Sequence, residues 1–231
     1  MADEIKNESE NTEQNPVEAA VAAAPLKGLV GTKVGMTRIF LNDTTMVPVT
    51  VVSAEGIVVS NVKKQETDGY AAVQVSYGDI VNRKLSKAEL GHFEKKNLKP
   101  KRFLREFPVD DAAPFQLGQV VPVTSFQKGD LVDVSGMNKG RGFAGGVKRH
   151  GFSGGPHSHG HGEYRKSPGS SGAQGPQHVL PGTRKPGHKG HVWQTIQNVE
   201  VVDVDTEKNL VLLRGSVPGP NGNFVVIRPS H

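Results

Sequence analysis

The central segment of the chain, residues 139–191, restricts the fold more than any other feature, because it cannot form a hydrophobic core. It holds 15 of the 28 glycines, five prolines and seven of the nine histidines, but only eight hydrophobic residues. A segment with so few apolar side chains cannot offset the conformational entropy that folding removes. It also carries nine Lys or Arg and one acid, Glu163. Because loops of this length are usually functional or disordered, we interpret it as an extended basic arm.

The sequence on both sides of this segment has β character. Short runs rich in Val and Ile, separated by turn-forming residues, occur at 28–78, at 119–135 and after residue 194. Many short strands joined by small turns favour a barrel or a sandwich over an α/β fold. We therefore expect a mainly β protein, with one β-barrel domain built from residues 26–138 and 192–231.

One insertion in the β-rich sequence is predicted to be helical. In SKAELGHFEKKN, residues 86–97, Ser86 and Glu89 have the spacing of a capping box. The basic stretch KPKRFLREF follows at 99–107, with phenylalanines between its charges. It is either an ordinary packed segment with solvated Lys and Arg or a secondary RNA contact. We expect residues 86–107 to form a small helical insertion.

The N-terminal 25 residues form a separate acidic segment. Residues 1–25 contain six Asp or Glu and one Lys. Secretory signals need basic residues there and transit peptides are poor in acids, so we expect a disordered tail and a cytoplasmic protein. The whole chain carries +5 and the tail carries −5, so residues 26–231 carry +10. A domain this basic predicts an anionic polymer or surface as its partner.

A glycine motif at the start of the arm raises the alternative of a nucleotide site. Gly140, Gly142 and Gly145 match G-x-G-x-x-G. A dinucleotide-binding motif must open a helix after a strand, and the following HGFSGGPHSHGHG shows no apolar periodicity, so we expect no helix there. The strand and catalytic motifs that a kinase loop requires are also missing from the sequence. We therefore expect no nucleotide cofactor.

The histidines of the arm raise the alternative of a metal site. His157, His159 and His161 alternate within a glycine-rich stretch, a spacing that does not hold three rings around one ion as a helical H-E-x-x-H does. Adventitious metal binding stays open, but we expect no functional metal. The chain has no cysteine, no G-x-S-x-G elbow and no paired carboxylates in the arm. We therefore expect no enzymatic activity.

Binding to a polyanion accounts for all the unusual features of the arm. Its basic residues lie at close intervals, and its glycines let the backbone approach phosphates. Phe143, Phe152 and Tyr164 either stack on unpaired bases or pack locally. Trp193, the only tryptophan, is either a plug against the core at the base of the arm or a stacking partner. No run of about 18 apolar residues occurs, so a membrane span is not expected.

Several motifs of the arm resemble the ribosomal protein L3 family. These are GMNKGRGFAGGVKRHGF, GGPHSHG and YRKSPGSSG, accompanied by the opening GLVGTKVGMTRIF and the closing NLVLLRGSVPGPNG. The resemblance covers residues 26–229. It implies a translation-protein-type β-barrel with a long loop that runs through ribosomal RNA (rRNA) towards the peptidyl transferase centre. It also implies direct rRNA binding, an early role in large-subunit assembly, neighbouring ribosomal proteins as partners, and no cofactor, small-molecule substrate or membrane partner.

The resemblance assigns the RNA-binding residues to three parts of the arm. The outward half holds Lys139, Arg141, Phe143, Lys148, Arg149, His150, Phe152, His157, Ser158 and His159. The tip region holds Arg165, Lys166 and Gly169, next to Pro168, and the returning half holds Arg184, Lys185, His188 and Lys189. The family's usual PGSIG is here PGSSG, with Ser171 in place of isoleucine. Ala173 replaces a glutamine that some bacterial members methylate, so we do not transfer that modification to Gln174.

Two rival functions remain at this stage. One is a metal-dependent enzyme that uses the histidine cluster. The other is an RNA chaperone outside the ribosome, which would share the chemistry of the arm and differ in location.

Overall fold

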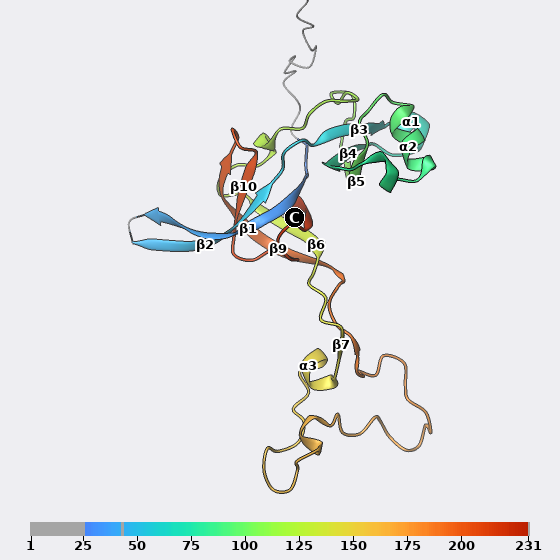
Figure 1. Cartoon of the computed structure of the whole chain (residues 1–231), viewed down its shortest axis with the longest axis vertical. Coiled ribbons are helices and arrows are strands. Elements are labelled where there is room, and N and C mark those ends of the chain that lie inside the picture. The colour runs from blue at the N-terminus through green and yellow to red at the C-terminus, as the bar shows by residue number, and fades with distance from the viewer. Residues whose placement is uncertain (1–25, 43, 231) are drawn as a thin grey trace, which may run out of the picture.

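The computed structural model describes residues 26–42 and 44–230, and Figure 1 shows their arrangement. The predicted acidic tail at 1–25 lies outside these residues. The strands are β1 (Leu29–Asn42), β2 (Thr45–Ser53), β3 (Val58–Lys63), β4 (Ala72–Asp79), β5 (Lys101–Pro108), β6 (Leu131–Met137), β7 (Phe143–Ala144), β8 (Gly187–His188), β9 (Trp193–Asp205), β10 (Leu210–Arg214) and β11 (Phe224–Pro229). The α-helices are α1 (Gln65–Asp68), α2 (Lys87–Glu94) and α3 (Gly146–His150), and the 3₁₀ helices are η1 (Asn82–Lys84), η2 (Val123–Ser125) and η3 (Tyr164–Lys166).

Six strands from the two ends of the chain close into a barrel. Their order is β1-β11-β6-β9-β10-β2, and every neighbouring pair is antiparallel. Leu29 lies opposite Ile227, and Val211 lies opposite Val52, so strands distant in sequence share one hydrogen-bonded ring. The prediction of a mainly β protein with a barrel is therefore confirmed. Among the described residues, no helix is long and apolar enough to cross a membrane.

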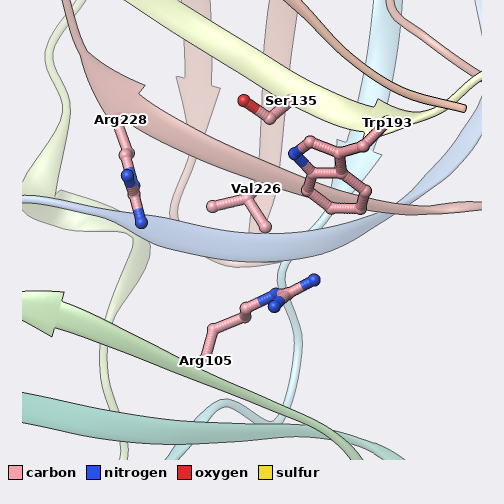
Figure 2. Close-up of a pocket in the computed structure, with 5 residues that line it drawn as sticks. All are labelled: Arg105, Ser135, Trp193, Val226 and Arg228. Atoms are coloured by element: carbon pink, nitrogen blue, oxygen red, sulfur yellow. The ribbon is translucent and has the colours of Figure 1, made fainter.

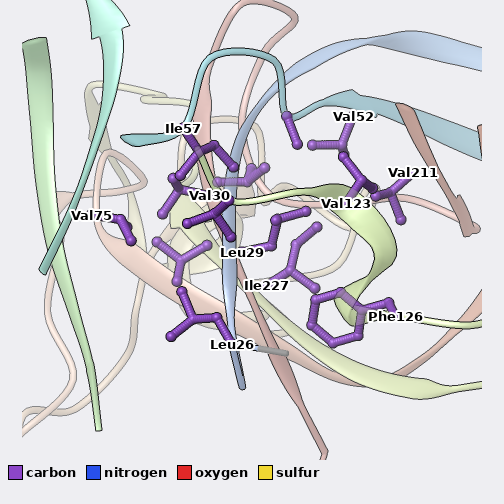
Figure 3. Close-up of a cluster of buried hydrophobic side chains, with 14 of the residues drawn as sticks. Leu26, Leu29, Val30, Val52, Ile57, Val75, Val123, Phe126, Val211 and Ile227 are labelled. Atoms are coloured by element: carbon purple, nitrogen blue, oxygen red, sulfur yellow. The ribbon is translucent and has the colours of Figure 1, made fainter. Parts of the chain in front are cut away.

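The barrel interior is filled by branched aliphatic side chains, drawn in Figure 3. Leu29, Val52 and Ile227 are at most 1% exposed and belong to one continuous cluster. Full burial of such a side chain contributes about 1.5–3 kcal/mol to the free energy of unfolding. The Val and Ile runs recognised in the sequence therefore form the core that the arm cannot provide.

A second sheet corrects two predictions made from the sequence. Strands β3, β4 and β5 form a three-stranded sheet of their own, so only part of residues 26–138 builds the barrel. The expected helical insertion at 86–107 is helical only over α2, where the Ser86 hydroxyl and the Glu89 carboxylate cap each other's backbone N–H. Residues 101–108 form β5 instead, because they pair along their length with β4, and this pairing places Phe103 and Phe107 on one face of the strand.

The second sheet packs against the outer face of the barrel through β5. The rings of Phe103 and Phe224 stack with centroids 4.3 Å apart. Phe107 is fully buried and belongs to the same hydrophobic cluster as Leu29 and Val30. The barrel and the three-stranded sheet therefore share one core.

The arm leaves the barrel between β6 and β9. These strands are antiparallel neighbours, with Met137 opposite Trp193, and the Asn138 N–H donates to the Val192 carbonyl (3.0 Å). The outgoing and returning segments therefore start side by side. Figure 1 shows the arm extending from this point away from the barrel.

Candidate nucleic-acid interface

The base of the arm is a narrow two-stranded ribbon. Past Asn138, the Arg141 N–H donates to the Lys189 carbonyl (2.8 Å), and the Lys189 N–H donates to the Gly142 carbonyl (2.9 Å). The short strands β7 and β8 continue the pairing, with Phe143 opposite His188. These backbone bonds hold the outward and returning basic residues at a set spacing.

A short helix follows the glycine motif, which corrects the prediction that no helix would form there. Helix α3 ends at His150 and is capped by Gly151, whose backbone is left-handed (φ 75°) and whose N–H donates to the Val147 carbonyl (3.0 Å). A helix of one turn needs no apolar periodicity of the kind that longer helices show. The strand before it, β7, is antiparallel to β8, so the motif is not part of a parallel βαβ nucleotide-binding unit.

Helix α3 is attached to the returning half of the arm by its basic side chains. The Arg149 guanidinium donates to the Lys185 carbonyl (2.8 Å), and His150 Nε2 donates to the same oxygen (3.1 Å). Gly187 allows this approach, because a Cβ there would lie 2.6 Å from Arg149 Nη1. Arg149 and His150 therefore organise the arm as well as adding to its charge.

The far part of the outward half folds back on itself. The Gly155 N–H donates to the Arg165 carbonyl (3.1 Å), and Arg165 Nη1 donates to His157 Nδ1 (3.2 Å). Residues 26–42 and 44–230 contain no group of three His, Asp or Glu placed to hold a metal ion. His157 Nδ1 instead accepts a hydrogen bond from a guanidinium, so this ring takes part in the local structure of the arm.

A concave surface lies between three segments of the arm. It has a volume of about 600 Å³ and is lined by residues 150–154, 167–171 and 183–185. Its walls carry Arg184 and Lys185, and the Lys185 ammonium donates to the Ser171 hydroxyl. The serine that replaces the family's usual isoleucine therefore adds a polar group to a basic concavity.

None of the seventeen predicted RNA-binding residues is buried. The exposed ones are Lys139, Arg141, Phe143, Lys148, His157, Ser158, His159, Arg165, Lys166, Gly169, Arg184 and His188. The half-buried ones are Arg149, His150, Phe152, Lys185 and Lys189. Within the described ranges, none of the nine Lys and Arg of the arm forms an ion pair with a carboxylate. Their charge is therefore available to an external anion.

The comparisons with known proteins agree with this geometry. The family model "Ribosomal protein L3" matches residues 109–231, which include the whole arm and the closing barrel strands. The chain belongs to the ribosomal protein L3 family. The resemblance identified from the motifs of the arm is therefore confirmed.

Bacterial relatives match the L3 chain over most of its length. The protein of Carboxydothermus hydrogenoformans named "Large ribosomal subunit protein uL3" is 48% identical over 203 residues, which cover 87% of this chain and 96% of the relative. The protein of the same name from Thiobacillus denitrificans is 50% identical over 206 residues, covering 88% and 96% respectively. L3 proteins are structural proteins of the ribosome, so this chain is not an enzyme, as predicted.

The structure also shows exposed residues that sequence reasoning placed wrongly or missed in this L3 protein. Trp193 is 44% exposed, so the interpretation as a plug against the core is wrong. The Arg105 guanidinium lies 5.0 Å from the centre of its ring. Arg228, which belongs to no motif of the sequence, lines the same surface. The alternation of residues in KPKRFLREF indicates that Arg105 shares a face with two phenylalanines. No feature of the neighbouring sequence shows that this face lies beside Trp193.

Proposed function

We propose that this L3 protein is a structural constituent of the large ribosomal subunit that binds large-subunit rRNA directly through the arm, residues 139–191. The observation that carries the proposal is the arrangement of the arm. Nine Lys and Arg without a carboxylate partner among the described residues lie on a glycine-rich ribbon that extends from a folded barrel. Such a ribbon brings positive charge deep into a folded RNA, where a globular surface does not reach.

The binding mechanism combines charge neutralisation with contacts from the backbone. Lys and Arg that replace condensed counterions supply most of the affinity for nucleic acid. Glycine-rich segments let backbone N–H groups approach phosphate oxygens without steric hindrance from side chains. The basic concavity between residues 150–154 and 183–185 is a site of this kind, since it joins two cationic side chains to glycine backbone.

The aromatic side chains of the arm add contacts to unpaired bases. Phe143 is 80% exposed and Tyr164 is 68% exposed, so neither is used in a core. Unpaired bases in RNA loops stack on such rings. This pattern favours a folded RNA with single-stranded loops over a regular duplex, whose bases are already stacked.

The proposal also covers the division of the chain into a body and an arm, the position of the arm in the subunit and the role in assembly. Residues 26–138 and 192–231 form the body, with the barrel as its largest part, and the arm reaches towards the peptidyl transferase centre. By holding several rRNA helices together, the protein acts early in subunit assembly, next to other large-subunit proteins. It works in the cytoplasm, without a cofactor or a small-molecule substrate.

The salt dependence of rRNA binding tests the mechanism. If about two thirds of the nine basic residues of the arm meet phosphates, the slope of log K against log salt concentration is on the order of −4 to −6. A triple variant of exposed residues, Lys148→Gln, Lys166→Gln and Arg184→Gln, should make this slope less steep by about 3. The matched control removes three exposed charges around α2, with Lys84→Gln, Lys87→Gln and Lys95→Gln, and should leave the slope unchanged.

The location of the protein is tested by sucrose-gradient sedimentation of ribosomal subunits. We expect the protein in the large-subunit fraction, and we expect the triple arm variant to be depleted from it relative to the control variant. Affinity for RNA without sedimentation in that fraction would instead indicate an RNA chaperone outside the ribosome.

A further inference from the structure

A second basic and aromatic surface lies outside the arm, where β5 meets the barrel (Figure 2). It is an open cavity of about 400 Å³ lined by Arg105, Ser135, Trp193, Val226 and Arg228. Figure 2 shows Arg105 pointing from β5 towards the indole of Trp193, with Val226 lying between that indole and Arg228. The cavity therefore joins two guanidinium groups and one large aromatic ring.

The alternation of side chains in two strands creates this surface. In β11, Val225 and Ile227 point into the barrel and are fully buried, so Val226 and Arg228 belong to its outer face. In β5, Arg105 shares a face with the phenylalanines that pack on the barrel. Arg105 and Arg228 therefore lie at the edge of the contact between the three-stranded sheet and the barrel, where solvent reaches them.

Trp193 presents a ring that is prepared for stacking. The Arg105 guanidinium lies over the indole at 5.0 Å and over the Phe224 ring at 6.0 Å, so cation–π attraction holds it beside both rings. The indole still keeps 44% of its surface exposed. A planar group can therefore cover the open part of the ring while the guanidinium stays in place.

The two arginines of the cavity have no carboxylate partner in the described part of the chain. Asp133 lies opposite Arg228 in the strand register but forms no ion pair with it, and its carboxylate accepts the Asn198 N–H (3.1 Å). Glu106 follows Arg105 in β5 and bonds to Tyr70 and Gln74 on the other side of the strand. Both guanidinium groups are therefore free to bind phosphate oxygens, for which their planar donors are well matched.

We propose that this cavity binds an unpaired nucleotide of RNA, with its base stacked on Trp193 and its flanking phosphates held by Arg105 and Arg228. The proposal rests on the proposed function, because it takes RNA as the ligand, but it assigns a separate site on the body of the protein. Trp193 is the first residue of β9, and Asn138 Nδ2 donates to the Gln194 side chain at the base of the arm (3.0 Å). An RNA strand that follows the arm to its base reaches this cavity.

Fluorescence of Trp193 tests the proposal directly, because it is the only tryptophan in the chain. A base stacked on the indole quenches its emission, whereas RNA bound only to the arm does not touch it. Titrating the full-length protein with a short oligouridylate should quench the emission in a saturable manner. Heparin, a polyanion without bases, should leave it largely unchanged, and uridine monophosphate should quench only at far higher concentration.

Arginine variants that keep the tryptophan provide a second test of the proposal. Arg105→Gln and Arg228→Gln should each raise the quenching midpoint about tenfold, as expected for loss of a charged hydrogen bond. Each should also make the salt dependence of quenching less steep by about one unit of slope. The control is Arg102→Gln, which removes an exposed arginine from the other face of β5 and should change neither quantity. Thermal unfolding followed by circular dichroism shows whether each variant is folded.

The possible failures are distinguishable from one another. Absence of quenching in a protein that still sediments with the large subunit would overturn this inference and leave the proposed function intact. Equal quenching by heparin would show a contact that depends on charge alone, without a stacked base. Equal potency of uridine monophosphate would show a free-nucleotide site in place of an RNA site. Loss of rRNA binding by the wild-type protein would refute the proposed function itself.

Discussion

Gly190 lies at the point where the returning half of the arm passes Lys139. Its backbone is left-handed (φ 79°), and a Cβ at this position would lie 2.2 Å from the Lys139 carbonyl oxygen. Any other residue therefore meets both an unfavourable conformation and a clash with backbone that cannot move independently. At the scale of single residues, the close passage of the two halves of the arm requires glycine at this crossing.

Replacing Gly190 with alanine should loosen the base of the arm and leave the barrel intact. The expected local cost is about 1–3 kcal/mol. We expect faster proteolysis within residues 139–191 and weaker rRNA binding, with little change in the melting temperature of the barrel. The matched control is Gly175→Ala, which has a free Cβ position and no left-handed φ and should behave as the wild type. Equal proteolysis of the two variants would contradict this role of Gly190.

Helix α2 illustrates how an element combines a local signal with tertiary contacts. Its capping box is visible in the sequence and present in the structure. Its other attachment is not local: His92 Nε2 lies 3.3 Å from the Gln74 side-chain oxygen, and the Lys96 ammonium donates to the Ser60 carbonyl (3.0 Å). Burial, together with the charges of Lys96 and Lys63, lowers the pKa of His92 below its usual value. The helix therefore packs on its sheet with a neutral imidazole.

This arrangement predicts a loss of stability in acid. Below about pH 6.5 the unfolded chain protonates His92 more readily than the folded chain does, so stability falls as the pH drops towards the lowered pKa. His92→Gln should reduce this loss, because glutamine keeps a polar partner for Gln74 and does not titrate. Urea unfolding between pH 5 and 7 (about the range in which histidine titrates) measures the difference. Parallel stability curves for the two proteins would refute the role of His92.

At the scale of the whole molecule, different interactions stabilise the barrel and the arm. The barrel strands share a continuous core, whereas the arm contains a single buried hydrophobic residue, Ala144. The arm is therefore held by a small number of backbone and polar contacts, and we expect bound RNA to supply the remaining order. Limited proteolysis should cut within residues 139–191 in the free protein and not in the assembled subunit. Equal protection in both states would be inconsistent with ordering by RNA.

Removing the arm should leave a folded barrel. Met137 and Trp193 are already paired across β6 and β9, so an Asn-Gly turn that joins Asn138 to Val192 closes a simple hairpin. We expect cooperative thermal unfolding near the wild-type temperature, together with loss of most of the rRNA affinity. A deletion variant that fails to fold would show that the arm contributes to the core.

The sequence by itself determined the division between a β-rich body and a basic arm, because composition decides which segments can bury apolar surface. It also determined the capping box of α2 and the family, since both depend on residues adjacent in the chain. Helix α3 was not predicted, because a single helical turn bounded by glycines shows no periodic pattern of apolar residues. The tertiary structure alone decided that β3, β4 and β5 leave the barrel, and that Arg105, Trp193 and Arg228 meet. These residues come from three strands distant in sequence. Barrel closure, which places β9 and β11 on either side of β6, and the packing of β5 on the outer face bring them together.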